Sequence, residues 1–123
     1  MAEHNDFGNS AEELAAQYLL KKGYSILCRN YRYQKAEIDI IARKNSEIVI
    51  VEVKARTTDA FEEPQEAVKK KKIKLIVSAA DYFMQETERQ EEVRFDIITV
   101  LPDHQGTLQI NHIVNAFNAI DAS

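Results

Sequence analysis

The chain has little of what builds covalent or metal cross-links. Its 123 residues include one cysteine, three histidines and no tryptophan. The single cysteine, Cys28, excludes an intramolecular disulfide and fits a reducing cytoplasm. Cys28 cannot form a zinc site alone, and the histidines (His4, His104 and His112) show no ligand spacing. A disulfide scaffold and a structural zinc site are therefore excluded.

Long apolar runs are also absent. No stretch approaches the roughly 20 residues that a membrane-spanning helix needs, and the polar N-terminus has no signal-peptide pattern. We expect a cytoplasmic protein without membrane contact. Only three glycines and two prolines are present, with no linker, repeat or low-complexity tract. The length indicates one domain over residues 1–123, with 1–7 and 118–123 frayed.

The chain has fewer basic than acidic residues, 16 lysines and arginines against 20 aspartates and glutamates. The net charge is −4 and the pI is about 5.4. This balance argues against a general, sequence-blind nucleic-acid-binding protein. It leaves room for a local basic surface beside an acidic site, because the distribution of charge matters more than its sum.

Two apolar, β-forming segments carry charged residues in their middle. Glu37 and Asp39 interrupt the first segment, and Glu52 and Lys54 interrupt the second. Charges in such surroundings cost free energy unless they are paired or bound to a metal. The arrangement of the two segments therefore has to bring each charge to a partner or a metal that offsets this cost.

An antiparallel hairpin with its turn at residues 45–46 would supply it. This turn sets Asp39 opposite Glu52 and Glu37 opposite Lys54. Two facing carboxylates need a shared proton or a cation between them, and Mg²⁺ is the hard ion that suits oxygen ligands. Lys54 would then stand beside the metal, where it could orient a water or stabilise developing negative charge.

The spacing leaves an alternative open. Glu37 and Lys54 could form a plain cross-strand salt bridge, with Asp39 paired to an arginine elsewhere. The dipeptide Asn-Ser is a weaker hairpin signal than Asn-Gly. A register shift of one residue would put the facing pairs on opposite sides of the sheet.

The hydrophobic pattern predicts an α/β protein in the order helix, three strands, helix, two strands. The first helix is expected over 11–22, with Ser10 and Glu13 as a capping box and Gly23 as its stop. The second helix is expected over 64–88, starting at a proline. The predicted strands are 24–28, 36–42, 48–55, 94–100 and 108–113. Residues 115–123 are expected to be a short helix or a tail, and Arg94 and Asp96 share a strand face and are expected to pair.

Three further features allow both a functional and a structural interpretation. Glu12 borders the apolar stripe of the first helix, as an inward carboxylate or a flanking surface charge. Arg29 and Arg32 alternate with tyrosines, which suits phosphate contacts and base stacking but also a plain amphipathic strand. Lys72 falls on the apolar stripe of the second helix, where it either snorkels or brings a cation to the acidic cluster or a phosphate.

These residues together resemble a known family. Over residues 8–117 the chain is similar to the bacterial YraN family, within the PD-(D/E)XK (restriction-endonuclease-like) nuclease superfamily, and to archaeal Holliday junction resolvases. The positions that carry the likeness are Gly8, Glu12, Gly23, Tyr24, Asn30, Tyr31, Arg32, Glu37, Ile38, Asp39, Val51, Glu52, Val53, Lys54, Arg56, Ala67, Val68, Lys72, Arg94, Phe95 and Asp96. Two positions depart from the pattern. Ile38 replaces the proline of the superfamily's name, and Ala36 stands where YraN-like sequences commonly carry glycine.

The resemblance implies a mixed central sheet flanked by helices and a Mg²⁺- or Mn²⁺-dependent nuclease. Asp39 and Glu52 would ligate the metal with the backbone carbonyl of Val53, Lys54 would activate or position water, and Glu12 would add an acidic group. The implied DNA-backbone contacts are Lys72, Arg56, Arg29 and Arg32. The implied reaction is phosphodiester hydrolysis.

For so small a chain, recognition of DNA shape is expected rather than recognition of sequence, with branched or damaged DNA as the substrate. A homodimer or a protein partner is a further expectation, because the edge strand at 108–113 could pair with another copy. Two other functions stay open. One is a non-catalytic nucleic-acid-binding or adaptor domain on the same fold. The other is a metal-free acid–base enzyme that uses Glu52 and Lys54.

Overall fold

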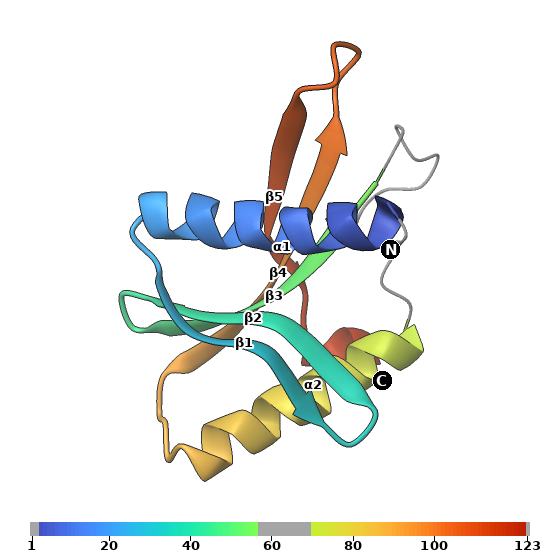
Figure 1. Ribbon diagram of the computed structural model, residues 1–123. Coiled ribbons are helices and arrows are strands. Elements are labelled where there is room, and N and C mark those ends of the chain that lie inside the picture. Colours follow the sequence, from blue (N-terminus) through green and yellow to red (C-terminus); the bar gives the residue numbers. More distant parts are fainter. Residues whose placement is uncertain (1–2, 57–69, 123) are drawn as a thin grey trace.

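The computed structural model of the chain describes residues 3–56 and 70–122 (Figure 1). A mixed five-stranded sheet is flanked by two helices in the predicted order, which confirms the expected architecture. The elements are α1 (Glu3–Lys21), β1 (Ser25–Tyr33), β2 (Ala36–Lys44), β3 (Glu47–Ala55), α2 (Lys70–Glu86), β4 (Glu92–Pro102), β5 (Leu108–Phe117) and the 3₁₀-helix η2 (Ala119–Ala122). None of the described helices is long and apolar enough to cross a membrane.

The strands lie in the sheet in chain order, β1-β2-β3-β4-β5. Among the described strands, β3 and β4 are the one parallel pair, and α2 lies in the connection between them; the other neighbours are antiparallel. The hairpin between β2 and β3 has the predicted register, because Lys44 pairs with Glu47 across a two-residue turn. In that turn Asn45 has a φ of 54°, a left-handed conformation that asparagine adopts more readily than most residues.

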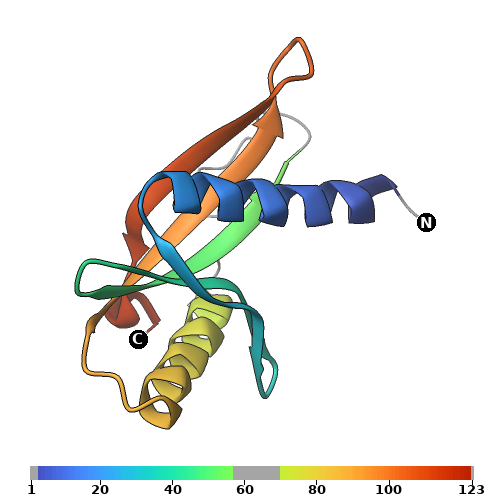
Figure 2. The ribbon, with the colours of Figure 1, turned by 60° about the vertical axis from the view of Figure 1, so that its left-hand side comes forward.

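The middle of the sheet is buried on both faces. Figure 2 shows α1 on one side of it and α2 on the other. On β3, Ile48 and Ile50 pack toward α2, whereas Val49 and Val51 pack toward α1. Each of these four side chains is at most 1% exposed, and burying one such side chain contributes about 1.5–3 kcal/mol. This two-sided burial explains why β3 reads as a continuous apolar run instead of an alternating one.

The first helix is longer than predicted. It begins at Glu3, so Ser10 lies inside it, and the predicted capping box with Glu13 is wrong. The upstream residues contain no proline, and a single glycine inside a helix costs only about 1 kcal/mol, so the helix can extend past the predicted cap. The predicted stop is confirmed: Gly23 has a φ of 91°, and the N–H of Tyr24 donates to the carbonyl of Leu19 at 2.9 Å.

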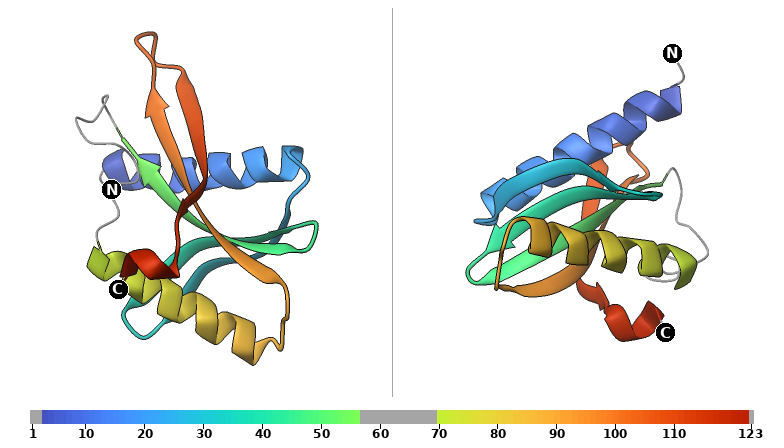
Figure 3. Two further views of the ribbon diagram at one scale, coloured as in Figure 1. Left: turned by 180° about the vertical axis from the view of Figure 1, so that it is seen from behind. Right: turned by 90° about the horizontal axis from the view of Figure 1, so that it is seen from below.

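The second helix is described from Lys70, so its predicted start at Pro64 lies outside the described residues. It ends at Glu86, two residues before the predicted end. The C-terminal region also differs from the prediction, because β5 continues to Phe117 and includes Asn115. Only the η2 turn after it is helical, and it lies beside α2 (Figure 3). The longer strand is explained by pairing with β4, including Phe95 with Phe117, which local sequence does not reveal.

The sheet divides where β2 leaves β3. Their paired residues run from Lys44 and Glu47 to Ile40 and Val51 and stop there. Beyond this point β2 curls with β1 toward α2, while β3 continues beside β4 (Figures 1 and 2). The strand also changes face, since Ile40 packs on the α1 side and Ile38 on the α2 side. We call the region between Asp39 of β2 and residues 52–54 of β3 the fork.

Candidate metal and nucleic-acid site

Asp39 lies where the ladder between β2 and β3 ends. Its carboxylate oxygen Oδ2 accepts a hydrogen bond from the backbone N–H of Val53 at 2.7 Å. A buried N–H without a partner costs free energy, so this side chain takes over the acceptor role that the departing strand gives up. The bond also holds Asp39 against the last residues of β3.

Glu52 is the second acid of the fork and is only 4% exposed. Burial, together with the charge of Glu52, raises the pKa of Asp39 to about 7, and the two carboxyl groups are hydrogen-bonded to each other. Near neutral pH the pair therefore either shares a proton or accepts a cation. The structure brings together the two acids that the sequence set opposite each other.

Two lysines lie against the same oxygen of Glu52. The Nζ atom of Lys54 lies 3.2 Å from Oε2, and Lys72 of α2 forms an ion pair with this oxygen. Burial lowers the pKa of Lys54 below its ordinary value. Burial also acts to lower the pKa of Lys72, but its hydrogen bond to Glu52 and the negative charge there outweigh it, so the pKa is raised. Of the two interpretations of Lys72, the one with its cation at the acidic cluster is correct.

The predicted contact between Glu37 and Lys54 is wrong. Glu37 lies beyond the fork, where β2 is paired only with β1, and it forms an ion pair with Arg32 at 3.3 Å. The hairpin register was right, but the strands separate before they reach this pair. Lys54 consequently has Glu52, on its own strand, as its acidic partner.

Glu12 approaches the fork from α1. Burial raises its pKa, Arg29 opposes the shift, and the carboxylates of Glu37 and Glu52 add to it. The charge of Glu12 in turn contributes to the raised pKa of Asp39. Glu12, which is half-buried, is thus close enough to the fork for its charge to act on Asp39.

The donor set suits a hard divalent cation with few protein ligands. Within residues 3–56 and 70–122, no three histidine, cysteine, aspartate or glutamate side chains lie close enough to ligate one metal ion. A bound Mg²⁺ would therefore need oxygen ligands besides Asp39 and Glu52, such as the backbone carbonyl of Val53 and water. Magnesium commonly keeps several waters and uses one or two protein carboxylates, so the residues fit this ion.

Thr99 is a neighbour that the sequence did not identify. It pairs with Lys54 in the register of β3 and β4, and it is 6% exposed. Its hydroxyl is buried and has no hydrogen-bond partner among the described residues. Buried hydroxyls are normally satisfied by protein or water, so Thr99 gives the fork a polar atom able to hold a water. The only sequence signal was a lone hydroxyl within an apolar strand.

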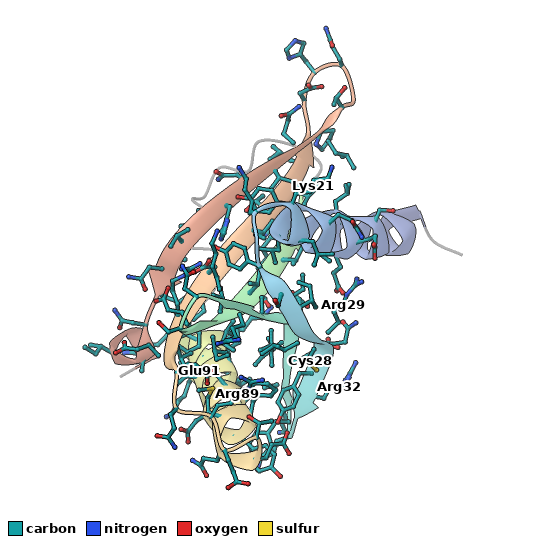
Figure 4. The ribbon with its side chains drawn as sticks, turned by 90° about the vertical axis from the view of Figure 1, so that its left-hand side faces the viewer. Lys21, Cys28, Arg29, Arg32, Arg89 and Glu91 are labelled. Atoms are coloured by element: carbon teal, nitrogen blue, oxygen red, sulfur yellow. The ribbon has the colours of Figure 1, made fainter. Side chains whose placement is uncertain are left out.

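The predicted DNA contacts from β1 lie on the outer surface. Arg29 is bound to Glu13 at 2.9 Å, and the side chain of Arg32, which pairs with Glu37, is 76% exposed. Figure 4 shows both arginines projecting outward from β1. Exposed ion pairs of this kind contribute about 0–1 kcal/mol, so a phosphate can compete for either arginine. Arg56 follows β3 directly and is half-buried.

A second polar cluster lies away from the fork, around the fully buried Asp96 on β4. Arg94 donates two hydrogen bonds to it, each at 2.9 Å, which confirms the predicted pair. His112 lies 2.7 Å from Asp96 and 2.9 Å from the hydroxyl of Tyr18, and the N–H of Asn115 also donates to Asp96. Burial acts to raise the pKa of Asp96, but these hydrogen bonds outweigh it and lower the pKa. The Asp96 cluster ties β4, β5 and α1 together.

Comparisons with known proteins find close relatives that share nearly the whole chain. A family model described as "Uncharacterised protein family UPF0102" matches residues 11–100. A UPF0102 protein of Christiangramia forsetii is 50% identical over 117 residues, which cover 95% of this chain and 98% of that protein. Those of Flavobacterium psychrophilum and Bacteroides thetaiotaomicron are both 48% identical over 95% of this chain, covering 98% and 96% of their own lengths.

Proposed function

The chain belongs to the uncharacterised protein family UPF0102, the family that its sequence resemblance indicated, and we propose that it is a metal-dependent nuclease of the PD-(D/E)XK type. The proposed reaction is hydrolysis of phosphodiester bonds in DNA. One observation carries the proposal: the half-buried carboxyl group of Asp39 and the buried one of Glu52 meet at an opening of the sheet with Lys54 beside them. An ion pair that serves only the fold has no need of a second acid, because two neighbouring negative charges repel each other and destabilise the folded state.

Each residue of the fork has a role in this reaction. Asp39 and Glu52 would hold Mg²⁺ or Mn²⁺, with the carbonyl of Val53 as a further ligand. When bound, the metal supplies Lewis-acid polarisation of the phosphate and activation of water. Lys54, whose pKa is lowered by burial, is suited to orient the attacking water or to take up its proton. Glu12 is suited to hold a second water.

The substrate is proposed to be recognised by shape. Besides the two lysines at Glu52, the described cations proposed to contact the DNA backbone are Arg29 and Arg32 on β1 and Arg56 after β3. Branched or damaged DNA offers backbone geometry that a small protein can recognise without contacts to base edges. This supports a structure-selective nuclease.

A non-catalytic nucleic-acid-binding or adaptor domain is the second candidate. It is favoured by the ion pairs of Lys54 and Lys72 with Glu52, because they already compensate that charge without a metal. Titration calorimetry with Mg²⁺ separates the two functions. Heat of binding that is lost in Glu52→Gln supports the nuclease, and no binding at millimolar metal, with DNA present, supports the adaptor.

The direct test is cleavage of DNA. Flap, four-way junction and linear duplex DNAs are incubated with the purified protein and Mg²⁺ or Mn²⁺. We expect cleavage of the branched substrates, and a loss of at least about 100-fold in Asp39→Asn, because removing one charged group that stabilises a transition state costs this much. Asp81→Asn, at an exposed position of α2, is the matched control. Cleavage that survives unchanged in Asp39→Asn would assign the activity to another site or a contaminant.

A further inference from the structure

A pocket adjoins the fork on the side of α2. Its volume is about 430 Å³, and it lies between the start of β2, with the turn before it, and the first turns of α2. Lys72, which lines this pocket, is also the residue that pairs with Glu52. Glu37, another lining residue, is separated from Asp39 by one residue of β2. We call this cavity the α2 pocket; it opens directly beside the proposed cleavage site.

The walls of the α2 pocket combine two chemistries. Ala36, Leu75 and Ile76 give it an apolar surface. Its charged lining residues are three lysines, Lys35, Lys71 and Lys72, and one acid, Glu37, whose charge is paired with Arg32. An apolar slot with cations at its edge complements a flat ring joined to an anionic group. A nucleotide has this composition, because every base has an apolar π-face and every phosphate is negative. The volume lies at the lower end of the range for small-ligand pockets, which suits a single base.

A pair of stacked tyrosines, which do not themselves line this pocket, is connected through β1 and α2 to two of its lining residues. The rings of Tyr33 and Tyr82 are 4.2 Å apart and inclined by 18°. Tyr33 pairs across the β1–β2 turn with Ala36, which lines the pocket. Tyr82 follows Leu75 by seven residues, about two helical turns on the same face. It is 41% exposed. Aromatic surface is therefore available to stack on a base at this end of the pocket.

We propose that the α2 pocket binds one unpaired nucleobase of a DNA strand whose backbone passes the fork. The inference rests on the proposed nuclease function, which it deepens by naming what selects the substrate. In a regular duplex every base is paired and stacked, so none is available to the pocket without extrusion. Single-stranded flaps and bulged or mismatched sites contain such a base. The site then discriminates by the presence of an unpaired nucleotide and not by sequence.

The absence of native tryptophan permits a specific measurement. Tyr82→Trp places a single indole beside the α2 pocket, and its fluorescence is followed with EDTA present during titration with short oligo(dT). We expect quenching on binding, because bases stack on indole. A strand of the same length with abasic sites should bind about tenfold more weakly, the usual effect of losing one stacked base. Equal affinity of the two strands, or binding seen by anisotropy without quenching, would overturn the proposal.

Charge-matched variants locate the site. Lys35→Ala/Lys71→Ala should weaken oligo(dT) binding by about tenfold, since each lysine that neutralises a phosphate releases counterions. Lys21→Ala/Lys74→Ala removes the same charge from exposed positions outside the pocket and should leave affinity unchanged. If both double variants weaken binding equally, the lysines act only by general charge attraction, and the proposed base-binding site is refuted.

The two proposals fail separately. Leu75→Phe narrows the pocket, and it should abolish the preference for base-containing over abasic strands; circular dichroism melting verifies its fold. A retained preference would place the base elsewhere. Because all these measurements are made without metal, missing nuclease activity does not affect them. Conversely, if the protein cleaves branched DNA but binds abasic and base-containing strands equally, only the proposal of a base pocket is contradicted.

Discussion

At the scale of the residue, two aspartates, Asp39 and Asp96, lie where the pairing of the sheet is irregular. Asp39 accepts the N–H of Val53 where β2 leaves β3, and Asp96 accepts the N–H of Asn115, near the irregularity between β4 and β5. The two carboxyl groups differ in their neighbours. Asp96 has a guanidinium and an imidazole, which outweigh burial and lower its pKa, whereas Asp39 has another acid, which adds to burial and raises it. Both aspartates therefore accept a backbone N–H, but their pKa values are shifted in opposite directions.

This difference predicts how Asp39 affects stability. Its pKa is about 7 in the folded protein and near the ordinary 3.8 in the unfolded chain. The folded state thus holds a proton that the unfolded chain releases, and stability from this group is complete below about pH 4 and lost as the pH rises through 7. Asp39→Asn keeps the acceptor for Val53 and removes the charge. At about pH 8 this substitution should raise the free energy of unfolding by on the order of 1–2 kcal/mol. At about pH 4, where Asp39 is already protonated, the change should be small.

Urea unfolding of the wild type and Asp39→Asn at both pH values measures this effect. The control Asp81→Asn, at an exposed position, should change the free energy of unfolding by the same small amount at both pH values. A variant that is destabilised at the higher pH would show that the Asp39 carboxylate is a net stabilising charge, contrary to the account given for the fork.

At the scale of the element, the two helices end in the same way with different residues. Both close with the backbone bonds of a Schellman motif, Tyr24 to Leu19 after α1 and Arg89 to Met84 after α2. The left-handed position is Gly23 in the first and Glu88, with a φ of 53°, in the second. A side chain with a Cβ is strained in this conformation by roughly 1–2 kcal/mol. The end of α2 is accordingly the less favourable of the two.

Glu88→Gly should therefore stabilise the protein by about 0.5–1 kcal/mol. The reverse exchange, Gly23→Glu, should destabilise it by about 1–2 kcal/mol, because it introduces at α1 the strain that α2 carries. Thermal melting monitored at 222 nm, where helix dominates the signal, gives both values. Opposite signs are expected for the two substitutions. A destabilised Glu88→Gly would mean that the Glu88 side chain contributes more than its backbone costs.

At the scale of the whole molecule, a protein of net charge −4 must meet DNA through a small local surface. The described cations assigned to phosphates near the fork and the α2 pocket are Arg29, Arg32, Lys35, Arg56, Lys71 and Lys72. If most of them engage, the plot of log affinity against log salt concentration should have a slope of about −3 to −5. Fluorescence anisotropy of a labelled flap with Asp39→Asn, in rising potassium chloride, measures this slope. A slope near zero would contradict phosphate contact at this surface.

Sequence alone predicted the parts of the fold that depend on short-range pattern. The hairpin at residues 45–46, the order of helices and strands along the chain, and the stop at Gly23 follow from turn chemistry and from the hydrophobic pattern. The meeting of Asp39 and Glu52 followed directly from that register. Nothing local marks the point at which two strands separate, so Glu37 was expected opposite Lys54.

Long-range packing accounts for the other differences. The Asp96 cluster joins residues from α1, β4 and β5, and its full extent depends on contacts distant in sequence. The unpartnered hydroxyl of Thr99 becomes visible only when β4 lies beside Lys54. The start of α1 at Glu3 was hidden because Ser10 offered a plausible cap inside a longer helix.

The bond between Asp39 and the N–H of Val53 has a consequence for evolutionary inference. In a descendant that has lost all chemistry at this position, the separated strands would still leave an amide in need of an acceptor. Selection for folding alone would then favour retaining an oxygen-bearing side chain there. Persistence of an oxygen-bearing side chain at position 39 is consequently weak evidence for hydrolysis. The identity of position 54, which no backbone group depends on, is the more informative character to compare.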